Sequence, residues 1–265
     1  MGILAIILSF AGVIFRVSAE SQRMAMANAE IMQKLRVITS QLDADFRGFI
    51  AEYGGYSTTS TVLATERAPD GTPRTVTTNF DGVFFFANGD FQSTGQYGGK
   101  TIVGNVASIY YGPPDPNSYR PSPGAEPVLP APRDRLLLRR QTILAPEAPQ
   151  SDSRYDGEYY CLSLEQWRTQ WYDKLDEWYG QPTIAPANLE SQLPMYLAKG
   201  VDNFTVHHLE TGTDLGTAAI AWQRQDSGGS GSISPAAFKV TFTLYDSKGV
   251  LKSGRTFTHI VLVGG

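Results

Sequence analysis

The chain has 265 residues, a formal net charge of -4 at pH 7, 26 glycines, 16 prolines and a single cysteine, Cys161. The weak negative charge excludes the strong basic field of a nucleic-acid-binding protein, and one cysteine excludes an intramolecular disulfide. The low charge content and the many glycines and prolines predict a domain of short strands and turns that relies on its core for stability.

The first predicted element is one very long helix over residues 1–53. No proline occurs before Pro69, and no glycine lies between Gly12 and Gly48, so nothing interrupts the helical hydrogen bonds. The pair Gly54-Gly55 supplies the expected stop. At about 1.5 Å per residue, the helix would be roughly 80 Å long.

The two parts of this helix differ in polarity. Residues 1–15 carry no charge, whereas residues 16–53 are amphipathic, with apolar side chains spaced by three or four on one face. We expect the first part to serve in a membrane or a filament core and the second to pack on a domain. The apolar positions that define the two surfaces are Ile3, Leu4, Ile7, Leu8 and Ile14 in the first part, and Ile31, Leu35, Ile38, Leu42 and Phe46 in the second.

Three interpretations of the apolar start compete. Val17, Ser18 and Ala19 have the small side chains of a signal-peptide cleavage site, but Arg16 stands in the neutral region before it and no basic region precedes the apolar run. A transmembrane helix needs about 20 apolar residues, so a segment of this length looks cut short at its front. The third interpretation, a buried helix of a soluble protein, is less favoured because the helix continues into a solvated amphipathic half.

Residues 54–265 are predicted to form a β-rich domain with an antiparallel sheet, because strand patterns follow one another without intervening helices. The pair Asn88-Gly89 is typical of a tight hairpin turn, residues 246–249 are predicted to form another turn, and residues 225–234 a flexible loop. The predicted strands cover residues 74–79, 83–87, 100–111, 135–144, 195–210, 217–224, 236–245 and 255–263.

An insertion is predicted at about residues 112–192. It begins with eight prolines in the 22 residues 112–133, a composition typical of an exposed, semi-stiff excursion. A second helix follows at residues 163–180, where Ser163 and Gln166 form a capping box. Its tryptophans could face the core, a protein partner or a sugar; the possible partner surface comprises Trp167, Trp171 and Trp178.

The histidines do not predict a metal site. His207 and His208 are neighbours on a predicted strand, so their side chains point to opposite faces. His259 could join one of them, but no cysteine or glutamate cluster completes a coordination sphere. We expect no metal and no cofactor.

The acidic residues predict no catalysis. Asp43 and Asp45 are two residues apart on a helix and diverge, unlike a cooperating acid–base pair. Residues 152–157 have a partial likeness to a calcium loop, but Arg154 occupies a ligand position and Ser163 stands where a bidentate glutamate is needed. Since phosphate-loop, dinucleotide and nucleophile motifs are also missing, we expect a protein that is not an enzyme.

Several segments resemble one family. Residues 1–9 (MGILAIILS) are similar to the second half of the hydrophobic segment of type IV pilins and type II secretion pseudopilins, and residues 35–48 (LRVITSQLDADFRG) resemble the later helix of the J-component minor pseudopilins and PilW-type minor pilins. The cleavage glycine, the Phe-Thr-Leu after it and the nearby glutamate of that family are absent here. Strand motifs in the same order follow at residues 83–86 (VFFF), 106–112 (VASIYYG), 135–140 (RLLLRR) and 197–204 (LAKGVDNF).

The resemblance implies an α+β, pilin-like fold with one long helix packed on an antiparallel sheet, and an N-terminally truncated chain. It implies a structural minor subunit, anchored in the inner membrane by a single pass with its domain periplasmic or extracellular. The implied partners are other pseudopilins or pilins, a prepilin peptidase and an assembly platform. The alternative with the same architecture is a membrane-tethered module that binds a glycan or a protein.

Overall fold

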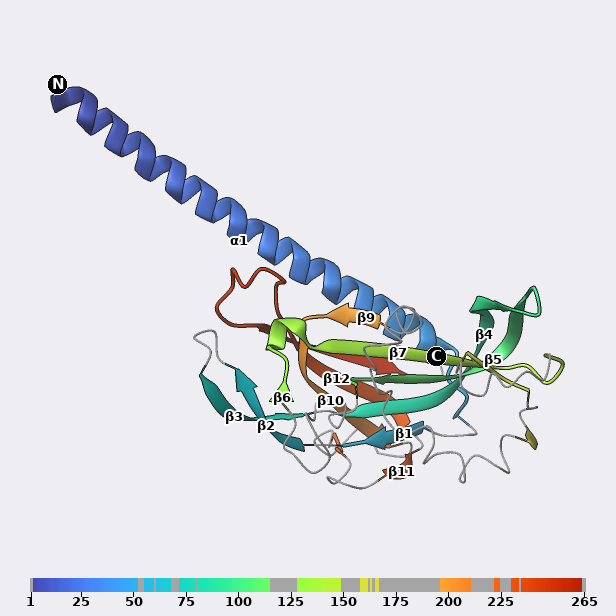
Figure 1. Cartoon of the computed structure of the whole chain (residues 1–265). Helices are drawn as coiled ribbons and strands as arrows, with labels where there is room; N and C mark the ends of the chain where they lie inside the picture. Colours follow the sequence, from blue (N-terminus) through green and yellow to red (C-terminus); the bar gives the residue numbers. More distant parts are fainter. Residues whose placement is uncertain are drawn as a thin grey trace.

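The protein consists of one long helix and a β-rich domain at its C-terminal end (Figure 1). The computed structural model describes residues 2–51, 55–59, 61–67, 72–79, 81–114, 128–148, 158–161, 163, 165–166, 196–210, 222–224, 230–233 and 235–263, and the structural statements below concern these residues. One helix with several mainly antiparallel sheets places the chain in the α+β class.

Helix α1 spans Gly2–Arg47 and therefore ends six residues earlier than predicted. The cause is Gly48, where a Cβ atom would overlap the carbonyl oxygen of Asn88 on strand β4 (Gly82–Tyr97). The chain leaves the helix there and pairs with that strand, with Asn88 N donating to Gly48 O at 2.7 Å and Ile50 N donating to Phe86 O at 2.9 Å. Close backbone approach, and not the later glycine pair, sets the end of the helix.

The largest sheet has seven strands in the order β11-β1-β4-β5-β7-β8, with β9 also paired to β7. Strand β7 (Leu136–Leu144) belongs to the segment predicted as an insertion, yet it lies inside this sheet beside β5. The other strands are β1 Gly55–Thr58, β5 Lys100–Gly112, β8 Tyr159–Tyr160, β9 Tyr196–Lys199 and β11 Ser230–Ile233.

Two three-stranded sheets complete the domain. One has the order β10-β12-β13, with β10 Val201–Glu210, β12 Pro235–Leu244 and β13 Arg255–Leu262. The other has the order β3-β2-β6, with β2 Thr61–Arg67, β3 Pro73–Asn79 and β6 Val128–Leu129, and a short 3₁₀ turn at Pro132–Asp134 follows it. The pairings are antiparallel except for β2–β6 and β7–β8.

The predicted hairpin at Asn88-Gly89 is wrong. Strand β4 continues through these residues to Tyr97, and the ladder with β5 only shifts its register between Asn88 and Phe91. The turn lies at Gly98 and Gly99, whose φ angles are +61° and +78°. Two residues with positive φ give the turn twist that suits a two-residue hairpin, and glycine reaches it without strain.

Two other predicted segments differ from the structure, and a third is described only in part. The predicted strand over residues 195–210 is divided at Gly200, whose φ of +80° sends β9 into one sheet and β10 into another. Within the predicted flexible loop 225–234, residues 230–233 form β11 and pair with β1. Of the predicted strand 217–224, the described residues contribute one bridge, between Gln223 and His208.

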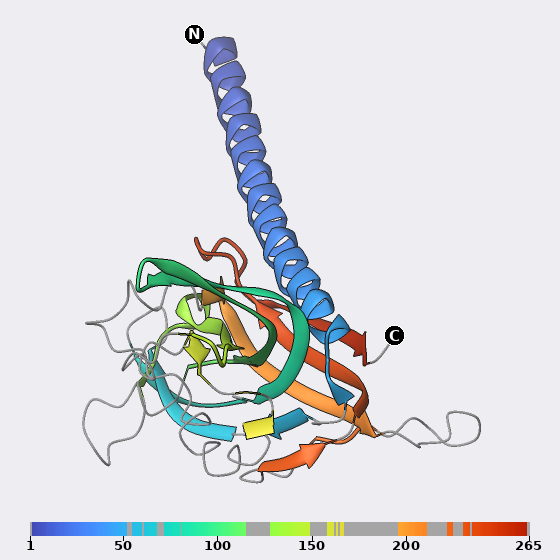
Figure 2. The same cartoon turned by 90° about the vertical axis from the view of Figure 1, so that its right-hand side faces the viewer.

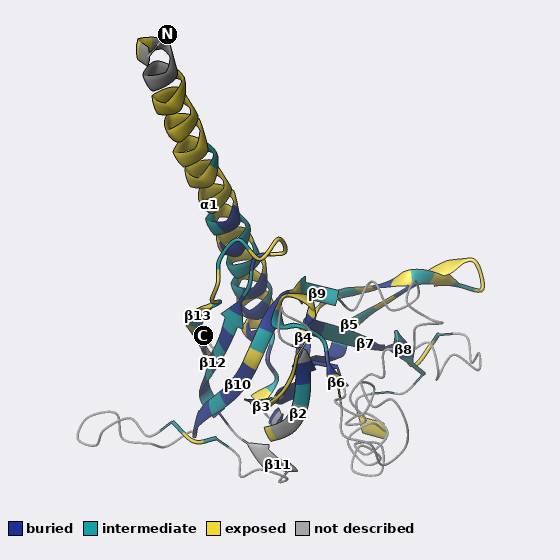
Figure 3. Ribbon diagram, turned by 60° about the vertical axis from the view of Figure 1, so that its left-hand side comes forward, coloured by how far each residue is buried: buried dark blue, intermediate teal, exposed yellow. Residues whose placement is uncertain are grey.

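The core lies between the C-terminal half of α1 and the sheets (Figure 3). The ring of Phe46 on α1 stacks on Phe85 of β4 at a centroid distance of 4.2 Å and meets Phe238 of β12 at 4.8 Å. Side chains from the seven-stranded sheet and from the β10-β12-β13 sheet therefore meet on one face of the helix, as the apolar spacing of that half predicts.

Candidate functional site

The N-terminal half of α1 projects from the domain as a free rod (Figure 2). Its large apolar side chains are between 60% and 80% exposed, and no charged residue precedes Arg16. A contiguous apolar surface of this kind marks an interaction site, because water covers it unfavourably. The exposed side chains are Ile3, Leu8, Phe10, Val13, Ile14, Phe15 and Val17; those of the predicted positions Leu4 and Ile7 lie outside the described residues.

The C-terminal half of α1 is docked on the domain, as predicted. The side chains of Ile31, Ile38, Leu42 and Phe46 are fully buried in the main core, and Leu35 packs against its edge. Each fully buried aliphatic or aromatic side chain stabilises the folded state by about 1.5–3 kcal/mol. The stripe therefore fixes which face of the helix meets the sheets.

A buried polar cluster also ties α1 to the sheet. Asp45 accepts two parallel hydrogen bonds from the Arg139 guanidinium on β7, from Nε at 2.6 Å and from Nη2 at 2.8 Å. Tyr111 on β5 donates its hydroxyl hydrogen to the same carboxylate, and Gln41 donates from Nε2 at 3.1 Å. A two-pronged arginine–carboxylate pair fixes both distance and orientation, so this cluster sets how α1 lies on the sheet.

The electrostatics of the cluster favour a neutral Tyr111 and a charged Arg139. Burial, and then the nearby Asp45 charge, raises the pKa of the Tyr111 hydroxyl, so this group stays protonated. Burial alone would lower the pKa of Arg139, but the hydrogen bonds and charge of Asp45 outweigh it and raise this pKa. The cluster is thus a stable ion pair with a neutral phenol, an arrangement suited to holding two elements together rather than to exchanging protons.

A second polar contact holds α1 nearer to the rod. Glu30 pairs with Lys34 at 2.8 Å, as their spacing predicts, and its carboxylate accepts hydrogen bonds from the amide and the hydroxyl of Ser247, each at 3.0 Å. Lys34 also donates to the carbonyl oxygen of Tyr245 at 2.9 Å. The turn after β12 is therefore fastened to the point where the helix leaves the domain.

The acidic residues behave as expected of a diverging pair. Asp45 points into the cluster, whereas Asp43 points to β13 and pairs with His259 Nε2 at 2.8 Å.

His207 and His208 lie on opposite faces of β10, with His208 buried and His207 half-buried. Burial and the charges of Lys239 and Arg224 lower the pKa of His207. No group of three or more His, Cys, Asp or Glu side chains in the described part of the chain could hold a metal ion.

The predicted tryptophan surface and the predicted calcium-like loop fall in parts of the chain that are not described. Trp167, Trp171, Trp178 and residues 152–157 lie outside the described residues. The start of the second predicted helix is described and has its capping box: Ser163 N donates to Gln166 Oε1 at 2.9 Å, and Gln166 N donates to Ser163 Oγ at 3.2 Å. The predicted N-terminal signal of that helix is therefore confirmed.

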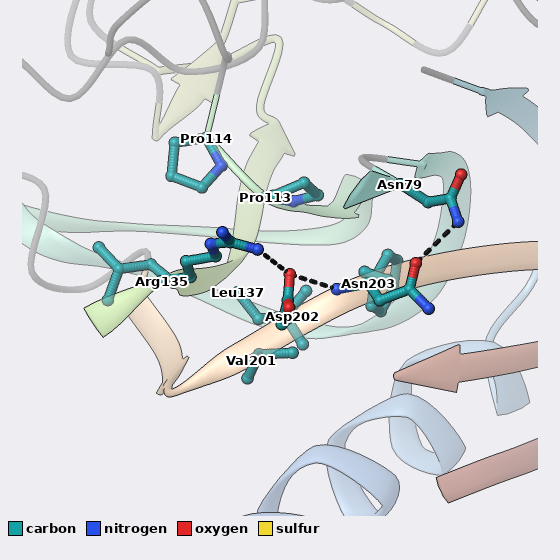
Figure 4. Close-up of a pocket in the computed structure, with 10 residues that line it drawn as sticks. Asn79, Pro113, Pro114, Arg135, Leu137, Val201, Asp202 and Asn203 are labelled. Carbon is teal, nitrogen blue, oxygen red and sulfur yellow. Dashed lines mark hydrogen bonds and ion pairs between the residues drawn. The ribbon is translucent and has the colours of Figure 1, made fainter. Parts of the chain in front are cut away.

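A small pocket lies where β10 meets the start of β7, with a lining of apolar side chains and a few polar ones (Figure 4). One of the polar lining residues is Arg135, which pairs with Asp202 through Nη1 and lies 3.6 Å from Glu66 through Nη2. Asn203 accepts a hydrogen bond from Asn79 Nδ2 at 2.7 Å on the opposite side. The cavity has a volume of about 10 Å³, which holds about one water molecule and is far smaller than a metabolite site. This cluster joins strands and offers no room for a substrate.

Sequence reasoning missed the partners of the buried charges. The divergence of Asp43 and Asp45 does not predict what Asp45 contacts, and the sequence pattern does not indicate Arg139 or Tyr111 as its partners. Asp81 was also missed, although it is fully buried and accepts hydrogen bonds from Arg224 at 2.6 and 2.9 Å. A charged residue inside a strand-forming run, as at Arg139, was the available signal, because burial of an isolated charge is costly.

No family model, curated protein or solved structure matches this chain. In the part of the chain that the structure describes, no helix has an apolar stretch long enough to cross a membrane.

Proposed function

We propose that this chain is a structural minor subunit of a pseudopilus or a type IV pilus, assembled through α1 for protein secretion or pilus assembly. The observation that carries the proposal is the division of α1: its C-terminal half is buried on the chain's own domain, while its N-terminal half carries large apolar side chains into solvent. A helix used only to complete a domain core would not extend over residues 2–26, beyond the first buried residue, Ala27.

The exposed half needs an apolar partner. Removing apolar area from water contributes about 25 cal/mol per Å², so covering several Ile, Leu, Val and Phe side chains gives a substantial driving force. Two environments can bury a helix without charge over residues 1–15: the lipid of a membrane and the apolar helices of sister subunits. The buried Asp45–Arg139 pair and the Glu30 contacts hold this rod in one direction relative to the domain.

The proposal also includes a pilin-like fold and a location of the rod and the domain in the cell. A long helix on a mainly antiparallel sheet is the pilin-like arrangement that the sequence resemblance implies. The rod would lie in the inner membrane and then in the filament, with the domain periplasmic or extracellular. Other pseudopilins or pilins would be its partners, and no chemical turnover would be involved.

The test asks whether the rod is a packing surface or only an anchor. We would combine Leu8→Ile, Val13→Leu, Ile14→Leu and Phe15→Leu, changes that keep the segment apolar but alter its shape. The full-length protein would be extracted from membranes in mild detergent, and the proteins that co-purify would be identified. Val103→Leu, at an exposed valine on β5, is the matched control.

The expected result is that the wild type and the control co-purify with other proteins that begin with a long apolar helix. The four-residue variant should remain in the membrane fraction but lose these partners. If it retains them, the rod is an anchor. If the wild type has no such partners and the domain binds a polysaccharide, the membrane-tethered binding module is the better description.

A further inference from the structure

Strand β13 is an edge strand with one bare side. It pairs with β12 over its whole length, and none of the strands described here pairs with its other side. Side chains of Phe257, His259 and Val261 face α1 and the core, whereas those of the alternate residues face outward. Among the outward side chains, Ile260 is 50% and Leu262 is 72% exposed.

The backbone groups on the bare side can be assigned. Val263 N donates to Ala236 O at 3.0 Å, which continues the β12–β13 ladder, so the odd-numbered residues of β13 direct their N–H and C=O groups to β12. Along a β-strand the backbone groups of successive residues alternate in direction, so the even-numbered residues of β13 direct their N–H and C=O groups away from β12. Thr256, Thr258, Ile260 and Leu262 therefore direct their N–H and C=O groups to the free edge, where none of the described strands pairs with them.

This edge lacks the features that protect exposed strands. Residues 256–262 contain no proline and no lysine, and the ladder with β12 has no register shift. Natural edge strands are usually interrupted by charges, prolines or bulges, because a regular edge accepts further strands. Only another extended backbone can satisfy a row of donors and acceptors at strand spacing while it also covers Ile260 and Leu262.

The flank of α1 above this edge is basic. The Asp43–His259 pair shows which side of the helix overhangs β13. Arg36 and Arg47, seven residues before and four after Asp43, lie on the same side of the helix and are exposed. In the described residues neither guanidinium has an ion-pair partner, and Asp43 is already occupied by His259.

We propose that β13 accepts an extended segment of a different polypeptide as an added strand. The segment has aliphatic residues at alternate positions, which lie beside Ile260 and Leu262, and acidic residues between them, which face Arg36 and Arg47. This edge lies outside the helix surface on which the proposed function rests.

A second copy of the chain is the poorer occupant. Helix α1 runs along the β12–β13 strands, from the Glu30 contact with Ser247 to the Asp43 contact with His259. Two identical β13 strands that pair around a two-fold axis would direct their rods oppositely, so the two apolar halves could not enter one membrane or one parallel bundle.

The test measures binding of two probes to the full chain in detergent by fluorescence anisotropy. The first probe is a fluorescein-labelled seven-residue peptide of alternating Val and Glu, and the second has Lys in place of Glu. The Glu peptide should bind and the Lys peptide should not.

Ile260→Pro removes one outward N–H without removing a bond to β12, and should weaken binding about tenfold or more. Ile260→Ala, which keeps the N–H, is the matched control and should bind more tightly than the proline variant.

A charge-reversal variant keeps the proposal testable if Ile260→Pro does not fold. Arg36→Glu with Arg47→Glu lies on the exposed helix surface and should reverse the preference, so that the Lys peptide binds better. Equal binding of the two peptides to the wild type, or unchanged binding by both variants, would overturn the proposal. It would equally be overturned by a wild-type dimer that Ile260→Pro dissociates, because the edge would then serve self-association.

Discussion

The two halves of α1 share a backbone geometry but differ in what surrounds them. From Ala27 onward the helix has a buried face and polar contacts to β5, β7, β13 and the turn after β12, whereas before it the large apolar side chains are exposed. Apolar residues are more frequent in the free half, with 16 among residues 2–26, than in the docked half, with 10 among residues 27–47. The apolar content of a helical segment therefore does not show whether the segment packs on its own domain. In α1 only the segment that lies beside the domain is buried.

The largest difference in stability between the two halves should follow when one leucine in each half is replaced by alanine. Leu42 is fully buried and Leu8 is 64% exposed on the same helix. Leu42→Ala should lower the free energy of unfolding by about 2–5 kcal/mol, because it removes transfer energy and leaves a cavity. Leu8→Ala should change it by less than about 0.5 kcal/mol.

Denaturant unfolding of the two variants under the same detergent conditions measures this difference. Equal stability losses would contradict the division of the helix into a docked half and a free half.

A smaller loss should follow from breaking the buried ion pair. Arg139→Met leaves the Asp45 carboxylate without its partner and should cost about 2–3 kcal/mol, below the range for fully enclosed pairs because the guanidinium is partly exposed. Arg16→Met, in the free half, should cost less than about 0.5 kcal/mol. The double variant Asp45→Leu with Arg139→Met should be more stable than Arg139→Met alone, since no charge then remains buried.

Thermal unfolding of the wild type, Arg139→Met, Arg16→Met, Asp45→Leu and the double variant checks these values. A double variant whose stability loss equals the sum of the Asp45→Leu and Arg139→Met losses would mean that the pair contributes nothing to the docking of α1.

Alanine substitutions of Gly48 in the docked region and Gly12 in the free half should change stability in opposite directions. Gly48→Ala should destabilise the protein by about 1–3 kcal/mol, because the added methyl group overlaps the carbonyl oxygen of Asn88. Gly12 has no atom within 4 Å of an added Cβ, so Gly12→Ala should stabilise the free half locally by about 0.5–1 kcal/mol.

Global unfolding reports the first change, and amide hydrogen exchange over residues 5–20 reports the second. Faster exchange in Gly12→Ala would show that the free half is not a simple exposed helix.

The smallest effect is a pH dependence at the junction of the two halves. Burial alone would raise the pKa of Glu30, but hydrogen bonds from Lys34 and Ser247 lower it below the ordinary value of 4.5. Because the folded-state pKa is depressed, the contact stabilises the fold above about pH 4.5 and this contribution is lost as the pH falls through the folded-state pKa.

Glu30→Gln should therefore be less stable than the wild type at pH 7, and the difference should shrink at pH 3. A difference in unfolding temperature that is the same at both values would exclude this linkage.

The sequence by itself determined the elements whose signals are local. The apolar spacing predicted the buried stripe of α1, the capping box predicted the start of the second helix, and strand-forming runs predicted β3, β5, β7, β12 and β13 closely. It also predicted that Asp43 and Asp45 diverge, since helical geometry alone requires it.

Tertiary structure decided the rest, because the deciding contacts join residues far apart in the chain. Gly48 ends the helix because β4 approaches it, Gly98 and Gly99 make the turn that Asn88-Gly89 was expected to make, and Gly200 divides a continuous strand pattern between two sheets. The pairing of Asp45 with Arg139 spans 94 residues, and no local pattern specifies it. Periodicity records which side of an element is buried, but it contains no information about which distant partner buries it.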